Sequence, residues 1–251
     1  MRTFIGASVA LALLVAAGPA SAESAAKVSQ LVGEAQVLRQ ASKHMQGEAI
    51  AAKAPWKALK SGELVHEGDA VKTAAASRLE LTVPDGSRVR LGASSQVVLS
   101  QGHFGKAGER KVTFTLWLGR VWAKVAKRMG GESSFEVKTH NAVAGVRGTS
   151  FAVMANADLS SVVKVYTGSV GVKSLVTAAA AAAPGTKARV RREVPGPERI
   201  DQRQWEEVVA TAMKQVKVTS LGEIQPAEDF VDAGDDEAWA MWNQSQDAAL
   251  Q

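Results

Sequence analysis

The stretch FEVKTHNAVAGVRGTSFAVMANADLSSVVKVYTGSVGV, residues 135–172, decides the fold class of this chain. Apolar residues alternate with polar ones in three runs, which begin at Phe135, Thr149 and Val163. Short glycine-containing segments, such as residues 145–148, separate the runs. Alternation with a period of two is typical of strands that bury one face, and glycine turns let successive strands pair. The stretch therefore predicts several β-strands joined by tight connections.

The same pattern continues upstream of this stretch. Two alternating runs flank Asp85-Gly86, a dipeptide that tolerates the positive φ of hairpin turns. The longest alternating run, residues 112–118, ends at Gly119. The units recur at irregular spacing, unlike the fixed-length repeats of a regular solenoid. We therefore expect an all-β core over residues 23–175, built of stacked antiparallel hairpins in a sandwich or irregular β-solenoid-like arrangement.

The N-terminus has the features of a secretory signal peptide. Arg2 precedes an apolar segment, and Ala20-Ser21-Ala22 provides an A-x-A cleavage site. We expect cleavage near Ala22 and a periplasmic or secreted mature chain. No later stretch approaches the roughly 20 apolar residues that a membrane helix needs, so we expect no transmembrane segment there. The chain has no cysteine and hence no disulfide, so its stability must come from core burial.

The composition changes after residue 175. Residues 176–197 contain an alanine run and then a basic stretch, which predict a linker followed by a charged edge strand. Residues 198–217 carry a capping pair at Asp201 and apolar residues at helical spacing, which predict an amphipathic helix.

Charge is distributed unevenly along the chain. Eight carboxylates and no Lys or Arg lie in residues 218–251, whereas residues 23–217 carry a formal charge of +12. We expect a mobile acidic tail, with a short helix starting near Asp235 that carries Trp239 and Trp242. A basic body with an acidic tail could bind an anionic partner, or the tail could fold back on the body. Solvated charge without either role is the simpler alternative.

No catalytic constellation is recognisable. The four histidines are scattered, and the absence of cysteine excludes thiol nucleophiles and thiolate metal sites. The sequence also lacks a phosphate-binding loop and a G-x-S-x-G nucleophile elbow. We therefore expect a protein that is not an enzyme and needs no cofactor or metal. The export signal also makes nucleic acid an unexpected partner.

One cluster could form a binding surface. Trp117 should face outward from the longest alternating run, and Trp122, Lys124, Lys127 and Arg128 follow the break at Gly119. An exposed aromatic pair beside basic residues could stack on a sugar ring or receive an acidic peptide. In the alternative interpretation, both tryptophans are covered and form a second layer of the core.

Arg147 is the second candidate binding residue. It could clamp a carboxylate. The interpretation that we favour is that it braces its loop by donating hydrogen bonds to nearby carbonyls, while Gly145 and Gly148 supply unusual backbone angles.

These segments together resemble the FecR domain, the extracytoplasmic part of the bacterial FecR family. The resemblance covers residues 28–172, and its most specific parts are Phe135-x-Val-x-Thr139 and Ala142-Val-Ala-Gly-Val-Arg-Gly-Thr-x-Phe151. It implies an all-β domain that, in the best-known relatives, senses an iron-siderophore receptor from the periplasm and regulates an extracytoplasmic-function sigma factor. The motif residues to which we assign a structural role are Asp85, Gly86, Gly119, Gly145, Arg147, Gly148, Thr149, Phe151 and Gly168.

The chain departs from the regulators of that family at its N-terminus. They carry a cytoplasmic sigma-binding segment and a membrane helix, where this chain has residues 1–22 with signal-peptide features. The resemblance therefore implies a non-enzymatic envelope module for protein interaction or signalling, with an envelope protein as its partner. A peptidoglycan or polysaccharide binder is the alternative, and a sigma-pathway component acting through a separate membrane regulator is a third possibility.

Overall fold

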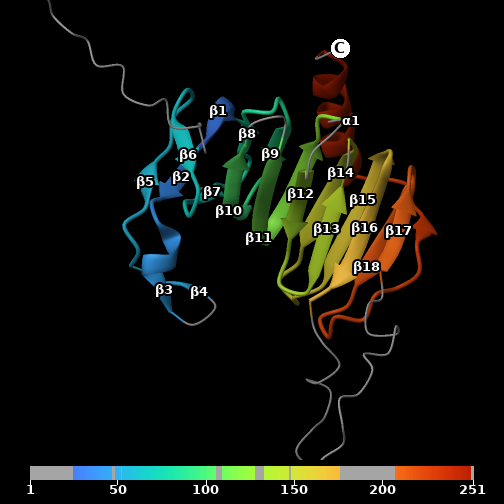
Figure 1. Cartoon of the computed structure of the whole chain (residues 1–251). Coiled ribbons are helices and arrows are strands. Elements are labelled where there is room, and N and C mark those ends of the chain that lie inside the picture. The colour runs from blue at the N-terminus through green and yellow to red at the C-terminus, as the bar shows by residue number, and fades with distance from the viewer. Residues whose placement is uncertain are drawn as a thin grey trace, which may run out of the picture.

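The computed structural model describes residues 25–46, 49–51, 53–105, 109–127, 133–146, 148–175 and 207–249. Within these residues, seventeen strands join in one large mixed sheet that folds into two layers, and a single α-helix follows near the C-terminus (Figure 1). The expected all-β core with a C-terminal helix is confirmed.

The first layer, sheet A, receives strands from the beginning, middle and end of the described chain. In spatial order it contains β6 (Leu64–His66), β1 (Ala25–Val32), β8 (Arg78–Thr82), β9 (Arg88–Leu91), the second half of β11 (Arg110–Lys124), β14 (Ser150–Ala155), β15 (Ser161–Thr167), β18 (Lys214–Val218) and β19 (Glu228–Asp229). All of these strands pair antiparallel.

The second layer, sheet B, has a similar extent. In spatial order it contains β5 (Lys57–Ala58), β2 (Ala35–Leu38), β7 (Ala70–Thr73), β10 (Gln96–Phe104), the first half of β11, β12 (Ser133–Lys138), β13 (Ala142–Val146), β16 (Ser169–Ser174) and β17 (Glu207–Thr211). The pairing of β11 with β12 is parallel. A short 3₁₀ turn (Ala41–His44) and the small hairpin of β3 (Met45–Gln46) and β4 (Ala49–Ile50) lie outside both sheets.

Strand β11 connects the two layers at Gly119. Leu118 still pairs with β10 of sheet B, whereas Gly119 already pairs with Ala155 of sheet A. Gly119 has a φ of +90°, and a Cβ atom there would lie 2.4 Å from the Oγ of Ser95. The backbone can therefore pass from one sheet to the other at this position because glycine has no side chain.

The main hydrophobic core lies between the sheets. It is built from the inward residues of the alternating runs, including Leu81 and Val153 of sheet A and Phe114 and Phe135 of sheet B. These side chains are at most 1% exposed. The period-two pattern of the sequence thus identifies the buried face of each long strand.

The helix predicted over residues 198–217 is wrong for the part that the structure describes. Residues 207–218 form β17 of sheet B and β18 of sheet A, and a turn with a φ of +63° at Met213 joins the two strands. The apolar residues of this segment fit a helical period and a strand period alike. Because β17 pairs with β16 and β18 pairs with β15, pairing at the sheet edges makes the segment form strands. Residues 176–206, with the predicted linker, edge strand and start of the helix, lie outside the described residues.

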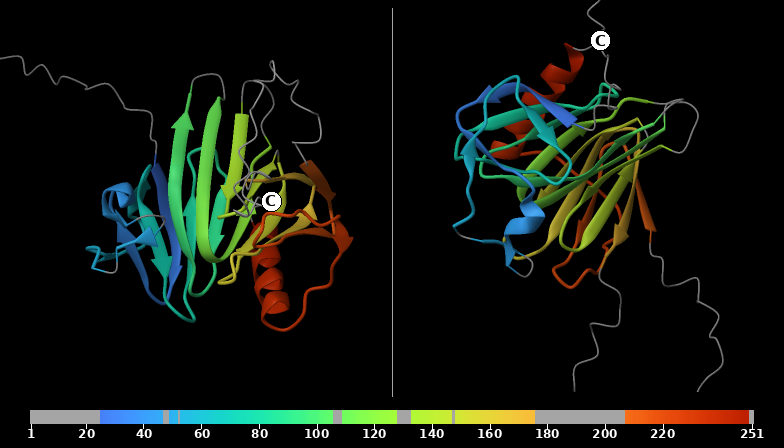
Figure 2. Two further views of the ribbon diagram at one scale, coloured as in Figure 1. Left: turned by 90° about the horizontal axis from the view of Figure 1, so that it is seen from below. Right: turned by 60° about the vertical axis from the view of Figure 1, so that its left-hand side comes forward.

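The C-terminal helix is α1 (Asp235–Ala248), and it begins where the short helix is predicted. It lies against the outside of the sandwich, as Figure 2 shows, and it buries Trp239, Ala240 and Asn243. The prediction of a mobile tail is therefore wrong for residues 218–249, because this segment packs on the body. No helix among the described residues is long and apolar enough to span a membrane.

Candidate functional site

The predicted surface around Trp117 and Trp122 is not formed. Trp122 is fully buried on the outer side of sheet A, whereas Trp117 is half-buried in sheet B. The turn at Gly119 is the reason, because it moves β11 from one sheet to the other. Lys127 is exposed beyond the end of β11, and Arg128 lies outside the described residues.

Trp122 instead lies at the centre of a second, smaller core on the outer side of sheet A. Its ring centroid is 4.3 Å from that of Tyr166, and Tyr166 packs edge-on against Phe230. Trp239 and Ala240 of α1 complete this cluster. The alternative of a covered second layer is therefore confirmed for Trp122, and the acidic tail provides the cover.

Residues on the outer side of sheet A, several of them charged, form a row across its strands. Register aligns Glu80 with Arg90, Arg90 with Trp122, and Ala152 with Lys164. Arg90 is fully buried, and its Nε donates to Glu80 at 2.7 Å. Outward positions of a sheet are normally solvated, so a buried arginine here requires a partner above the sheet.

Asp247 of α1 is that partner. Its carboxylate accepts hydrogen bonds from Arg90 Nη1 at 2.6 Å, Trp122 Nε1 at 3.1 Å and Ser150 Oγ at 3.2 Å. Lys124 Nζ donates to its backbone oxygen at 2.6 Å. A single carboxylate thus satisfies donors from three strands, and Lys124 of the predicted surface binds the chain's own tail.

A second set of contacts lies at the start of α1. Lys164 Nζ donates to Asp232 at 2.8 Å and to Asp236 at 3.1 Å, and the Tyr166 hydroxyl donates to Asp232 at 2.9 Å. Burial would lower the pKa of Lys164, but the hydrogen bonds and charges of the two aspartates outweigh it and raise that pKa. Burial and Asp232 both raise the pKa of Tyr166, so the phenol stays neutral at physiological pH.

Glu80 anchors the opposite end of the row across sheet A. It accepts hydrogen bonds from Ser29, Arg88 and Arg90. Burial would raise the pKa of its carboxyl group, but these hydrogen bonds and the charge of Arg90 hold that pKa below its usual value. The carboxylate therefore stays ionised and compensates the buried guanidinium.

Two tryptophans of α1 face the arginines of sheet A. The rings of Trp239 and Trp242 stack with centroids 5.4 Å apart. The Arg120 guanidinium lies 5.0 Å from the ring centroid of Trp239, and that of Arg78 lies 5.0 Å from that of Trp242. Two features of the sequence pointed to this interface: the uneven charge of the chain and the two tryptophans. Neither feature identified the strands against which the C-terminal segment packs.

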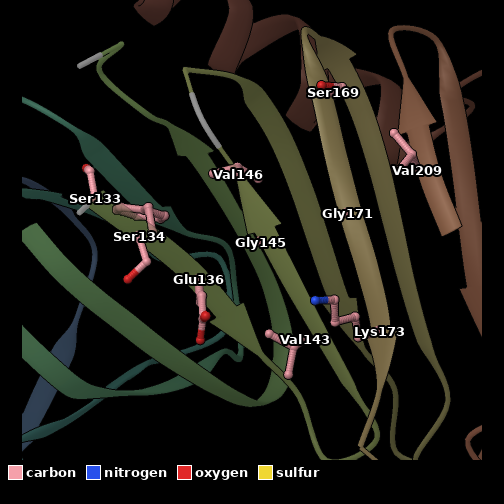
Figure 3. A pocket seen from close by; sticks show the side chains of 11 residues that line it. Ser133, Ser134, Glu136, Val143, Gly145, Val146, Ser169, Gly171, Lys173 and Val209 are labelled. Carbon is pink, nitrogen blue, oxygen red and sulfur yellow. The ribbon is translucent and has the colours of Figure 1, made fainter. Parts of the chain in front are cut away.

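Sheet B presents a hollow of about 400 Å³ on its outer side, shown in Figure 3. Register places Glu136, Gly145, Gly171 and Val209 side by side on β12, β13, β16 and β17. The two glycines form the floor of the hollow, and Val209 at its side is 59% exposed. A second hollow, of about 350 Å³, is lined by Trp117 together with Trp56, Lys72 and Gln96, among others.

Most motif residues lie at turns or in the core. Asp85 and Gly86 form the turn between β8 and β9, where Asp85 accepts from the Ser87 backbone and pairs with the buried Arg110. Gly168 forms the turn between β15 and β16.

The structure describes the motif residues on either side of position 147. Gly148 has a φ of +66°, and Thr149 and Phe151 are buried. Gly145 lies within β13, where a Cβ would meet nothing closer than 4.0 Å. Arg147 itself lies outside the described residues, so the choice between clamp and brace stays open. Among the described residues, no group of three or more His, Asp or Glu side chains could hold a metal ion.

Comparison with known proteins gives a family match and two structural likenesses. Two crystal structures of a putative anti-sigma factor from Parabacteroides distasonis are similar to this chain, with TM-scores of 0.46 and 0.45 and identities of 21% and 20%. Each match covers 70% of this chain and 64% of the solved chain. A comparison with curated proteins finds no significant match. Residues 69–171 match the family model described as FecR protein, so this part of the chain is a FecR domain.

Proposed function

We propose that this protein is a non-enzymatic FecR-domain protein of the cell envelope that acts as a protein-interaction module in signalling, with an envelope protein as its partner. The FecR match over residues 69–171 carries the proposal. The match spans β7 to β15 and the first half of β16, and thus includes strands that form the outer sides of both sheets.

The geometry of sheet B supports an interaction role. Its hollow combines a flat glycine floor with exposed Val209 and Lys173 beside it. Glycines within strands permit another backbone or a flat side chain to approach a sheet closely. A surface of this kind suits contact with another protein.

The carbohydrate-binding alternative loses its basis. It requires Trp117 and Trp122 on one exposed surface, and Trp122 is fully buried under α1. We therefore propose no second function.

Cell fractionation tests the location. A chain with a C-terminal tag should be recovered from the periplasmic or secreted fraction, with its N-terminus at Glu23, because residues 1–22 have signal-peptide features. An uncleaved chain in the cytoplasm would contradict the proposal.

Site-specific photocrosslinking in intact cells tests the partner. A photoreactive residue in place of Val209 should give a discrete adduct with one envelope protein. The control position is Val231, which is 92% exposed and lies outside the hollow of sheet B. Equal adduct patterns from both positions, or no protein adduct from Val209, would count against an interaction through sheet B.

A further inference from the structure

We propose that the outer side of sheet A is a binding surface for an acidic, tryptophan-bearing helix. In this proposal α1 occupies the surface in cis and can be exchanged for a helix of the same chemistry presented by a partner protein. The proposal identifies a second interaction surface and is independent of the sheet B hollow.

Charge complementarity is the first argument. The described strands of sheet A present Arg78, Arg90, Arg120, Lys124 and Lys164 to α1 and the segment before it. The residues after Lys217 carry eight carboxylates and no basic residue. The surface therefore selects an acidic ligand, because a basic helix would leave these cations unpaired.

The contacts also specify two features of the ligand. One carboxylate must reach Nη1 of the buried Arg90, as Asp247 does, because Glu80 pairs with Nε and a buried N–H group that loses its acceptor is costly. Two aromatic rings must fit against Arg78 and Arg120, as the stacked tryptophans of α1 do.

The interface between α1 and sheet A has features that favour exchange of the helix over permanent packing. Only two of the four residues that α1 buries are apolar, Trp239 and Ala240. Three buried polar atoms at this interface have no hydrogen-bond partner among the described residues: Arg90 Nη2, Trp239 Nε1 and Asn243 Oδ1. Such atoms weaken an interface, because each loses hydration without compensation.

The sandwich is complete without α1. The core between the sheets contains no residue of the helix, which contacts a separate cluster on the outside. An isolated helix of 14 residues is marginal in water, and Asp247 in its last turn opposes the helix dipole. Helix formation and docking of α1 are therefore coupled, as for a ligand that folds on binding.

The test uses the full chain and a labelled synthetic peptide of residues 228–249. The variant Asp236→Asn with Asp247→Asn removes carboxylates that pair with Arg120, Lys164 and Arg90. The matched control, Asp235→Asn with Glu237→Gln, removes the same charge from exposed positions of α1. Fluorescence anisotropy should show the variant binding the peptide at least tenfold more tightly than the wild type or the control, because the resident helix competes less well.

A second variant removes the tether. A protease site inserted between Ala233 and Gly234, which are both exposed, lets α1 be cut from the folded chain. The released fragment should remain bound at high protein concentration, dissociate on dilution or at high salt, and rebind when added back. If the fragment leaves and never rebinds, or if the charge variant and its control bind the peptide equally, the proposal is overturned. Failure here would leave the crosslinking test of sheet B unaffected.

Discussion

Replacement of Gly119 by alanine should destabilise the protein strongly. At this position β11 leaves sheet B and enters sheet A with a φ of +90°, a conformation that L-residues rarely adopt. An added Cβ would lie 2.4 Å from Ser95 Oγ and 2.6 Å from the Cα atom of Ser95.

The surroundings cannot give way cheaply. Ser95 is 1% exposed, and its hydroxyl accepts from the Arg120 backbone at 3.0 Å. A left-handed alanine costs about 1–2 kcal/mol, and overpacking of a filled site costs about 1–3 kcal/mol. We therefore expect the free energy of unfolding to fall by about 2–5 kcal/mol. The melting temperature should fall by roughly 2–4 °C for each kcal/mol of stability that is lost.

Gly145→Ala is the matched control. Gly145 is also a motif glycine, but its φ lies outside the left-handed region and its nearest prospective contact is the Gly171 carbonyl at 4.0 Å. Alanine in a strand should therefore be neutral or stabilising by about 0.5–1 kcal/mol.

Urea unfolding followed by circular dichroism measures both variants. The reasoning is refuted if Gly119→Ala unfolds within about 1 kcal/mol of the wild type, which is less than the cost of the backbone conformation alone. It is also refuted if Gly145→Ala is destabilised as much as Gly119→Ala.

Two further predictions concern buried charges. Asp85→Ala should lower the free energy of unfolding by about 3–5 kcal/mol, measured by urea titration, because it leaves Arg110 buried without its partner; Asp158→Ala, at an exposed carboxylate, should change it far less. The folded chain holds the pKa of the Glu80 carboxyl group below 4.5. The contribution of Glu80 to stability is therefore complete above pH 4.5, and it is lost as the pH falls through the lower pKa of the folded state. Urea midpoints measured from pH 7 to pH 3 should fall less steeply for Glu80→Gln than for the wild type, and identical slopes would contradict this assignment.

The sequence alone determined the β-strands and their inward faces. Period-two alternation identifies Phe114 and Phe135 as core residues, because a strand with one buried face must alternate. The dipeptide Asp85-Gly86 likewise identifies a hairpin turn from local chemistry. The resemblance of the motif segments predicted a FecR domain, which the match over residues 69–171 confirms.

Only the tertiary structure decided which surfaces exist. The passage of β11 between sheets at Gly119 separates Trp117 from Trp122, and the sequence does not show to which sheet each half belongs. Residues 207–218 fit helical and strand periods alike, so pairing with β15 and β16 determined that they form strands. The same holds for Asp247, whose contacts with Arg90 and Trp122 join residues more than 100 positions apart. Local pattern specifies an element, but long-range pairing and charge compensation determine its partners.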